Sequence, residues 1–426
     1  MLLIRTSPHF QPEKEYAFHV LFREMLGLEY RVEYQPASEH TLRLPNGAEL
    51  KMEDGFQAHK LPESLVPKKS GSESWMLPHH SSFIIHHSSF DIFAAAFFML
   101  TRWEETHSEV ERDAHGRFPA EKSAAWQQGF LHRPVVNEWA DWLWQELVRL
   151  GWRGERKRRE FKISVSCDVD HPRLWWSVTD RAKTLAGAVF KRGDFQEAKY
   201  WLNRPGWNSD LHDPYDVFDE WMDFFEKNGL VAQFNFMGER PYWSNCWYPL
   251  RHPFVQGLME KIAARGHGIG FHPSYEAFEN QEMFEQELAS LREISPVGIT
   301  SGRQHYLRFD APRTWQMWEA AGLREDSTLG YPEAEGFRCG ICHDFPVFDT
   351  KQRKMLSLRE KPLLAMDVTL AQYRRYTPEQ AAESLAQLRR EVEKHGGDFT
   401  LLWHNSSWNT PFWEDWKAVF HDFLSG

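Results

Sequence analysis

The chain reads Lys162-Ile-Ser-Val-Ser-Cys-Asp168-Val-Asp170 at the point where its sequence pattern changes. The apolar residues that lead up to Asp168 predict a short buried strand. Two carboxylates at positions i and i+2 of a strand end can reach the same edge of a sheet, where one can bind a cation and the other can act as a base. Such a pair alone is also typical of a solvated turn. The interpretation as a site therefore depends on whether other strand ends also carry residues that can bind a metal or transfer a proton.

Strands and helices are predicted to alternate after this stretch. Further strands are expected over 231–237, 267–271, 298–301 and 399–403, and helices over 216–227, 253–265, 281–294, 311–321 and 378–394. Alternation of this kind predicts an α/β fold, a distorted (β/α) barrel with a mostly parallel sheet. In such barrels the chemistry lies at the carboxyl ends of the strands.

Polar side chains follow three more of the predicted strands. His272 follows 267–271, Arg303-Gln-His305-Tyr306 follows 298–301, and Leu402-Trp403-His404 ends the last strand. A single histidine after a strand is more often a hydrogen-bonded loop residue than a ligand. Aspartate and histidines at four of the five predicted strand ends together predict a metal-dependent hydrolytic site.

The order and spacing of these segments resemble the polysaccharide deacetylases, the NodB-like carbohydrate esterases. The resemblance covers roughly residues 161 to 410 and rests on four motifs: Asp168-Val-Asp170, Gly266-His-Gly-Ile-Gly-Phe-His272, Arg303-Gln-His-Tyr306 and Leu402-Trp-His404. Together with His272-Pro-Ser-Tyr275 and Asp326-Ser-Thr-Leu-Gly-Tyr331, they look like a bacterial subgroup with an N-terminal domain of unknown role.

The resemblance implies a role for each matching residue. Asp168 would be the base, oriented by Arg303, and His404 would be the acid. The backbone N–H of Tyr306 would stabilise the oxyanion, and Tyr275, Trp403 and Arg308 would contact the substrate. The implied cofactor is a divalent metal ion, zinc first, with cobalt or nickel as alternatives. The implied substrate is a carbohydrate that carries an N- or O-linked acetyl group.

The metal ligands depart from the family pattern at one position. Asp170 and His272 match two ligands, but the family's second histidine, four residues after the first, is replaced by Glu276. Glu276 could ligate, since carboxylates complete accepted metal sets. His305, which stands in the place of the family's proline, is the favoured third ligand. A site without metal remains a third reading.

Residues 1–160 predict a smaller α+β accessory domain before the barrel of residues 161–426. Alternating polarity over 31–34 and 41–44 indicates strands, and Asn46-Gly47 predicts a hairpin turn. Helices are expected over 91–102 and 137–150, and the basic stretch 151–160 is interpreted as a linker. The His-rich segment 77–87 could bind metal, but histidine pairs in a Ser-rich loop are more often solvated or packed.

Composition limits the partners and the location. A net charge of −11 argues against nucleic-acid binding. No apolar stretch approaches the roughly 20 residues that span a bilayer, and no secretory signal is visible, so a cytoplasmic protein without membrane insertion is expected. The 20 tryptophans suit a buried core, sugar rings or both. Four cysteines form no disulfide framework, and nothing indicates the oligomeric state.

Two other classes of function are compatible with the same residues. The chain could be a catalytically inactive relative that binds a glycan or a protein partner, a reading that the Glu276 departure favours. It could also be an amidase that acts on a small non-sugar amide, because a fold does not choose its substrate. Metal content separates the first reading from an enzyme, and a substrate screen separates the second from a deacetylase.

Overall fold

The computed structural model describes residues 1–58, 91–106, 110–203, 213–240 and 246–426. The chain folds into two compact units. The first unit contains 1–162, 307–364 and 388–399, and the second contains 163–306, 365–387 and 400–426. Segments from both sides of residue 160 thus contribute to the first unit, and the division into domains 1–160 and 161–426 stays a prediction.

A small mixed sheet begins the first unit. Its strand order is β2-β1-β3-β4, with bounds β1 (Leu2–Thr6), β2 (Tyr30–Tyr34), β3 (Glu39–Arg43) and β4 (Glu49–Glu53). β1 pairs parallel with β2 and antiparallel with β3, and β3 pairs antiparallel with β4. The predicted hairpin is confirmed: the N–H of Gly47 donates to the carbonyl of Leu44, and Gly47 adopts a φ of 87° that favours glycine.

Helices with buried faces supply much of the core of this unit. The helices are α1 (Gln11–Phe18), α2 (Gly55–Ala58), α3 (Ile92–Leu100), α4 (Ala124–Gln127), α5 (Val135–Arg149) and α11 (Arg313–Ala320). Every residue of α3 is buried, and Asp91 caps its first turn by accepting from the N–H groups of Phe93 and Ala94. The helices predicted over 91–102 and 137–150 are therefore confirmed, with slightly different ends.

Three strands of the first unit come from 307–364: β9 (Glu325–Asp326), β10 (Phe345–Asp349) and β11 (Lys354–Glu360). β10 pairs antiparallel with β11, and β11 pairs parallel with β9. The antiparallel pair was not predicted. All five residues of β10 are buried, so its sequence lacks the alternation that marks a half-buried strand.

A buried ion network joins distant parts of the first unit. Glu105 accepts from Arg102 Nε at 2.7 Å and from Arg338 Nη2 at 2.6 Å. None of these three side chains is more than 1 % exposed. Removing one side chain of a buried charge network leaves another charge uncompensated, and this destabilises the folded state.

The second unit contains a mostly parallel sheet. Its strands run in the order β8-β7-β6-β5-β13-β12, with bounds β5 (Lys162–Val169), β6 (Gln233–Phe236), β7 (Gly268–Phe271), β8 (Ser301–Gly302), β12 (Ala365–Met366) and β13 (Asp398–Leu402). The pairs β5–β6, β6–β7, β7–β8 and β12–β13 are all parallel. The predicted mixed α/β class and parallel strands are confirmed, whereas a closed barrel stays a prediction.

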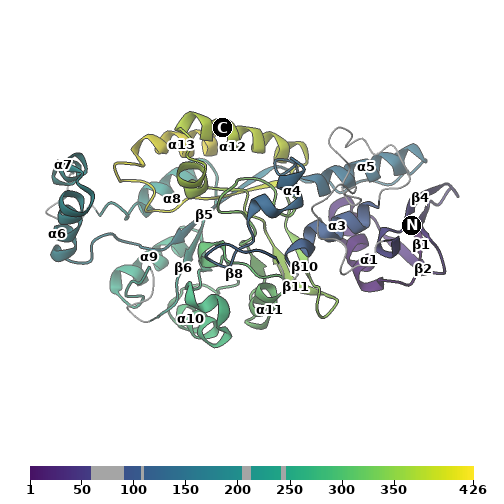
Figure 1. The fold of residues 1–426 in the computed structure, drawn as a ribbon, viewed down its shortest axis with the longest axis horizontal. Helices are drawn as coiled ribbons and strands as arrows, with labels where there is room; N and C mark the ends of the chain where they lie inside the picture. The colour runs from purple at the N-terminus through teal and green to yellow at the C-terminus, as the bar shows by residue number, and fades with distance from the viewer. Residues whose placement is uncertain (59–90, 107–109, 204–212, 241–245) are drawn as a thin grey trace. The chain divides into compact units, whose positions relative to one another are not determined.

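Helices alternate with these strands, and α8, α9 and α10 lie around them (Figure 1). The helices are α6 (Val178–Ala186), α7 (Phe195–Asn203), α8 (Phe218–Lys227), α9 (Pro253–Ala264), α10 (Gln281–Ile294), α12 (Pro378–Lys394) and α13 (Lys417–Ser425). The part of α12 from residue 388 onward belongs to the first unit. The predicted ranges of α10 and α12 match the observed bounds, whereas α6 and α7 were not predicted. Across the described ranges, no helix is both long and apolar enough to cross a bilayer.

The strand register brings the polar strand ends to one edge of the sheet. Asp168 on β5 is opposite Asn235 on β6, and Asn235 is opposite Gly270 on β7. A Cβ at Gly270 would lie 2.1 Å from Oδ1 of Asn235. Only glycine at this position leaves room for the Asn235 side chain, which is directed at Asp168.

Candidate active site

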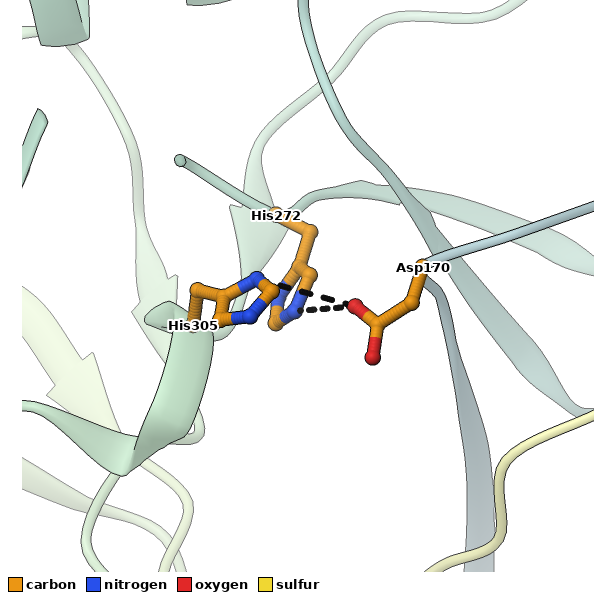
Figure 2. Close-up of side chains that lie close together, drawn as sticks. All are labelled: Asp170, His272 and His305. Carbon is orange, nitrogen blue, oxygen red and sulfur yellow. Dashed lines mark ion pairs between the residues drawn. The ribbon is translucent and has the colours of Figure 1, made fainter. Parts of the chain in front are cut away.

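Three potential metal ligands converge at the ends of β5, β7 and β8. Oδ1 of Asp170 lies 3.4 Å from Nε2 of His272 and 3.6 Å from Nδ1 of His305. Figure 2 shows both imidazole rings beside the Asp170 carboxylate. One ligand atom from each residue lies within 4.8 Å of the others. This spacing is compatible with one metal ion shared by the three side chains.

Hydrogen bonding leaves these atoms available. Among the described residues, buried Oδ1 of Asp170 and Nδ1 of His305 have no hydrogen-bond partner. His272 donates its Nδ1–H to the carbonyl of Arg303 at 2.7 Å, which fixes the tautomer that presents an Nε2 lone pair. Unsatisfied buried polar atoms are rare in folded proteins. Their convergence here fits a bound cation.

The charge state of the cluster also fits a divalent cation. Burial lowers the pKa of His305 to about 3, so its ring is neutral at physiological pH and can ligate. Burial opposes ionisation of Asp170, but the adjacent His305 and His272 lower its pKa below the ordinary value. Two imidazoles and one carboxylate form an accepted set for zinc and related metals.

Asp168 lies beside this cluster as a buried carboxylate. Its Oδ1 accepts from Nδ2 of Asn235 at 2.7 Å and from Nη1 of Arg303 at 3.0 Å. Burial raises the pKa of Asp168, but Arg303, His272 and His404 outweigh this effect and lower it below the ordinary value. Asp168 is therefore held ionised although its side chain is buried, a state suited to accepting a proton.

His404 follows β13 and pairs with a second buried aspartate. Its ring Nδ1 lies 2.8 Å from Oδ1 of Asp367, and its backbone N–H donates to Oδ2 of the same carboxylate at 2.9 Å. Burial lowers the pKa of His404, but the Asp367 carboxylate more than compensates and raises it to about 9. His404 is therefore protonated at neutral pH and can donate a proton from Nε2.

Two tyrosines border the cluster. Tyr306 stacks on His305 with 4.7 Å between ring centroids, and Tyr275 meets Tyr306 edge-on at 5.3 Å. Tyr306 has a φ of 61°, in the left-handed region that costs energy for a residue with a Cβ. The structure thus places the sequence-predicted Tyr306 next to the potential ligand His305, and Tyr275 against Tyr306.

The other two predicted substrate contacts, Trp403 and Arg308, have partners within the protein. Trp403 is fully buried, donates its Nε1–H to the carbonyl of Ser407 and packs on Phe420 at 5.2 Å. Trp403 thus packs in the core, and its substrate contact stays a prediction. Arg308 belongs to the first unit, where its Nε donates to the carbonyl of His115 at 2.8 Å.

Glu276, the alternative third ligand, begins a 3₁₀ turn after β7. In the part of the chain that the structure describes, the group of mutually close ligand atoms consists of Asp170, His272 and His305 and does not include Glu276. The arrangement therefore favours His305 over Glu276 as the third ligand.

Three residues beside the candidate ligands and proton donors and acceptors were not identified from the sequence. They are Asn235 and Asp367, described above, and Cys246, whose Sγ lies 3.9 Å from Nε2 of His305. One signal for Asn235 was present, a single buried polar residue between Phe234 and Phe236 of a strand. Asp367 follows a strand of only two residues, which gives no periodicity to detect.

A second cluster of potential ligands, in the first unit, is better explained without a metal. His40, Asp54 and Asp91 also bring ligand atoms together. However, Lys14 Nζ lies 2.5 Å from Asp54, and His40 bonds Thr6 through Nδ1 and Asp91 through Nε2. The lysine already supplies the compensating positive charge. The His-rich segment 77–87 lies outside the described residues.

A family model and solved structures of other proteins match parts of this chain. A family described as "Family of unknown function (DUF7033)" matches residues 2–151. A protein described as a polysaccharide deacetylase from Mycobacterium smegmatis is 15% identical, with a TM-score of 0.41 over 63% of this chain and 84% of its own. Another from Pseudomonas aeruginosa PAO1 is 13% identical, with a TM-score of 0.39 over 62% of this chain and 83% of its own. No curated protein gives a significant match.

Proposed function

We propose that this protein is a metal-dependent hydrolase that removes an N- or O-linked acetyl group from a carbohydrate or glycan precursor. One observation carries the proposal: one potential ligand atom each of Asp170, His272 and His305 lies beside the ionised carboxylate of Asp168. Those of Asp170 and His305 have no hydrogen-bond partner, and that of His272 is the lone pair of Nε2. A purely structural ion pair would use those atoms in hydrogen bonds. The four motifs that resemble the polysaccharide deacetylases supply the same residues in the same order.

Asp170, His272 and His305 would hold the metal, with zinc as first choice and cobalt or nickel as alternatives. When bound, a divalent ion in such a site polarises a carbonyl and lowers the pKa of water. Iron belongs in the test as well, because two histidines and one carboxylate also suit ferrous iron.

The chain's own residues account for the proton transfers. Asp168 accepts a proton from the attacking water, while Arg303 and Asn235 orient its carboxylate and keep it charged. His404, held protonated by Asp367, gives a proton to the departing amine or alkoxide. The backbone N–H of Tyr306 stabilises the oxyanion, and the loss of such a donor costs about 3 kcal/mol. Each of the three steps is thus assisted by one residue: water attack by Asp168, oxyanion stabilisation by Tyr306 and protonation of the leaving group by His404.

The first test is elemental analysis of the purified protein and of His272→Ala, paired with acetate release from acetylated sugars and small cyclic amides. We expect about one divalent ion per chain that is lost in the variant, and acetate from at least one sugar. Metal without acetate release, but with hydrolysis of a cyclic amide, would favour the amidase. Absence of metal from both proteins after zinc, cobalt, nickel and iron are offered would favour a binding protein.

A further inference from the structure

A pocket of about 520 Å³ in the second unit has no role in the chemistry described so far. This volume lies within the range of roughly 300–1,000 Å³ that is typical of ligand sites. Described residues from two loops and from α6 line it, and those that matter here are Leu174, Trp176, Asp180, Lys183, Trp247 and His252. We call this the tryptophan pocket.

Both loops of the tryptophan pocket contain residues that are close in sequence to the cluster of potential ligands, or to a residue that contacts it. This cluster consists of Asp170, His272 and His305. Leu174 follows the potential ligand Asp170 by four residues, so their Cα atoms are at most about 14 Å apart. Trp247 follows Cys246, whose Sγ lies 3.9 Å from Nε2 of His305. A ligand bound in the pocket can therefore belong to the same short oligosaccharide as a group that reacts at the cluster.

The two indole rings are held in place but are not covered. Trp175, the neighbour of Trp176, is buried and packs on Trp201 at 5.7 Å, whereas Trp176 is only half-buried and touches His252 edge-on at 5.2 Å. Trp247 is 39 % exposed, and its Nε1–H donates to the carbonyl of Arg240 at 3.1 Å. Both indoles thus keep accessible surface while their positions are fixed.

The charges that line the pocket compensate each other. Lys183 Nζ lies 3.1 Å from Asp180 Oδ1, and Asp180 Oδ2 accepts from the N–H of Trp176 at 3.2 Å. The remaining ionisable residue of the described lining is His252, whose Nδ1 accepts from the N–H of Phe254 and helps to cap α9. The pocket therefore suits a neutral ligand with apolar C–H faces and hydroxyl edges.

We infer that the tryptophan pocket is a subsite for a neutral pyranose unit of the glycan. The neighbouring unit of the same glycan would react at the cluster of potential ligands. The inference rests on the proposed function for the identity of the ligand. The C–H groups on one face of a pyranose carry partial positive charge and pack on the electron-rich face of an indole. The subsite makes the protein select oligosaccharides over single sugars.

The test compares binding of N-acetylglucosamine and of its tetramer by isothermal titration calorimetry. The proteins are the wild type, Trp176→Ala, Trp247→Ala and the double variant. Phe190→Ala, which removes an aromatic ring that is 87 % exposed and outside the pocket, is the matched control. We expect the wild type and the control to bind the tetramer more tightly than the monomer, and the double variant to lose at least about tenfold in tetramer affinity only.

Trp176→Phe with Trp247→Phe should restore most of the affinity, which excludes a folding defect as the cause. Equal tetramer affinity in the wild type and the double alanine variant would overturn the inference, as would a wild type that binds the tetramer no better than the monomer. If the tetramer binds through both tryptophans but the protein holds no metal and releases no acetate, the subsite stands and the proposed catalysis fails.

Discussion

Asp367 contacts His404 twice, through the ring Nδ1 at 2.8 Å and the backbone N–H at 2.9 Å. The two contacts fix both the direction of the imidazole and its protonation, because the carboxylate raises the pKa of His404 to about 9 in spite of burial. Asp367 itself is fully buried. The proposed acid thus depends on a residue that does not face the substrate.

The pH profile of acetate release should report this pair. His404 acts as an acid only when protonated, so the rate should fall as the pH rises through about 9. Asp367→Asn removes the negative charge that stabilises the imidazolium, and the alkaline limb should then move toward the ordinary histidine pKa of about 6.5. Asp223→Asn, at an exposed ion pair with Arg265, should leave the profile unchanged. An unshifted limb in Asp367→Asn would exclude His404 as the titrating acid.

Metal content should identify the third ligand. His305→Ala should lose the metal, because its Nδ1 is one of the three converging atoms, whereas Glu276→Gln should retain about one ion per chain. Inductively coupled plasma mass spectrometry after dialysis against a weak chelator gives the stoichiometry. The opposite pattern, with metal lost from Glu276→Gln and kept in His305→Ala, would assign the ligand to Glu276.

Asp168→Asn separates the base from the ligands. Asparagine keeps the shape and can still accept from Arg303, but it cannot take a proton. We expect kcat to fall by about 100- to 10,000-fold, the usual contribution of a general base, with metal stoichiometry unchanged. Acetate release and elemental analysis on the same preparation measure both quantities. Full activity in this variant would remove Asp168 from the mechanism.

The buried network of the first unit should control its stability. Glu105→Gln removes the charge that compensates Arg102 and Arg338, and breaking such a buried network costs about 3–5 kcal/mol. Chemical denaturation followed by circular dichroism measures the loss. Glu39→Gln, which breaks the exposed pair with Lys51, should leave the midpoint nearly unchanged. Similar midpoints for the two variants would contradict the structural role of the network.

The sequence predicts the strand ends better than the contacts around them. The positions of His272, His305 and His404 follow from strand–helix alternation, because the carboxyl ends of parallel strands share an edge. Asn235 and Asp367 reach the site through strand register and through a two-residue strand, neither of which periodicity reveals. Trp403 is predicted to contact the substrate, and the sequence does not reveal that its side chain is buried and packs on Phe420.

The sequence also did not predict that residues 307–364 belong to the same compact unit as the N-terminal residues. It depends on pairs such as Glu105–Arg338, which are separated by 233 residues. Charged residues of this kind look like surface residues in a sequence, because they are rarely buried unless paired. Only the fold shows that each has a buried partner.

Arg303 serves the site through two independent chemical groups. Its guanidinium donates a hydrogen bond to Asp168, and its backbone carbonyl accepts one from the Nδ1–H of His272. A substitution such as Arg303→Met deletes the first group and retains the second. The two functions of Arg303 can therefore be changed separately. A substitution at this position alters the control of the base Asp168. It retains the backbone carbonyl that orients His272, as long as β7 and β8 stay paired.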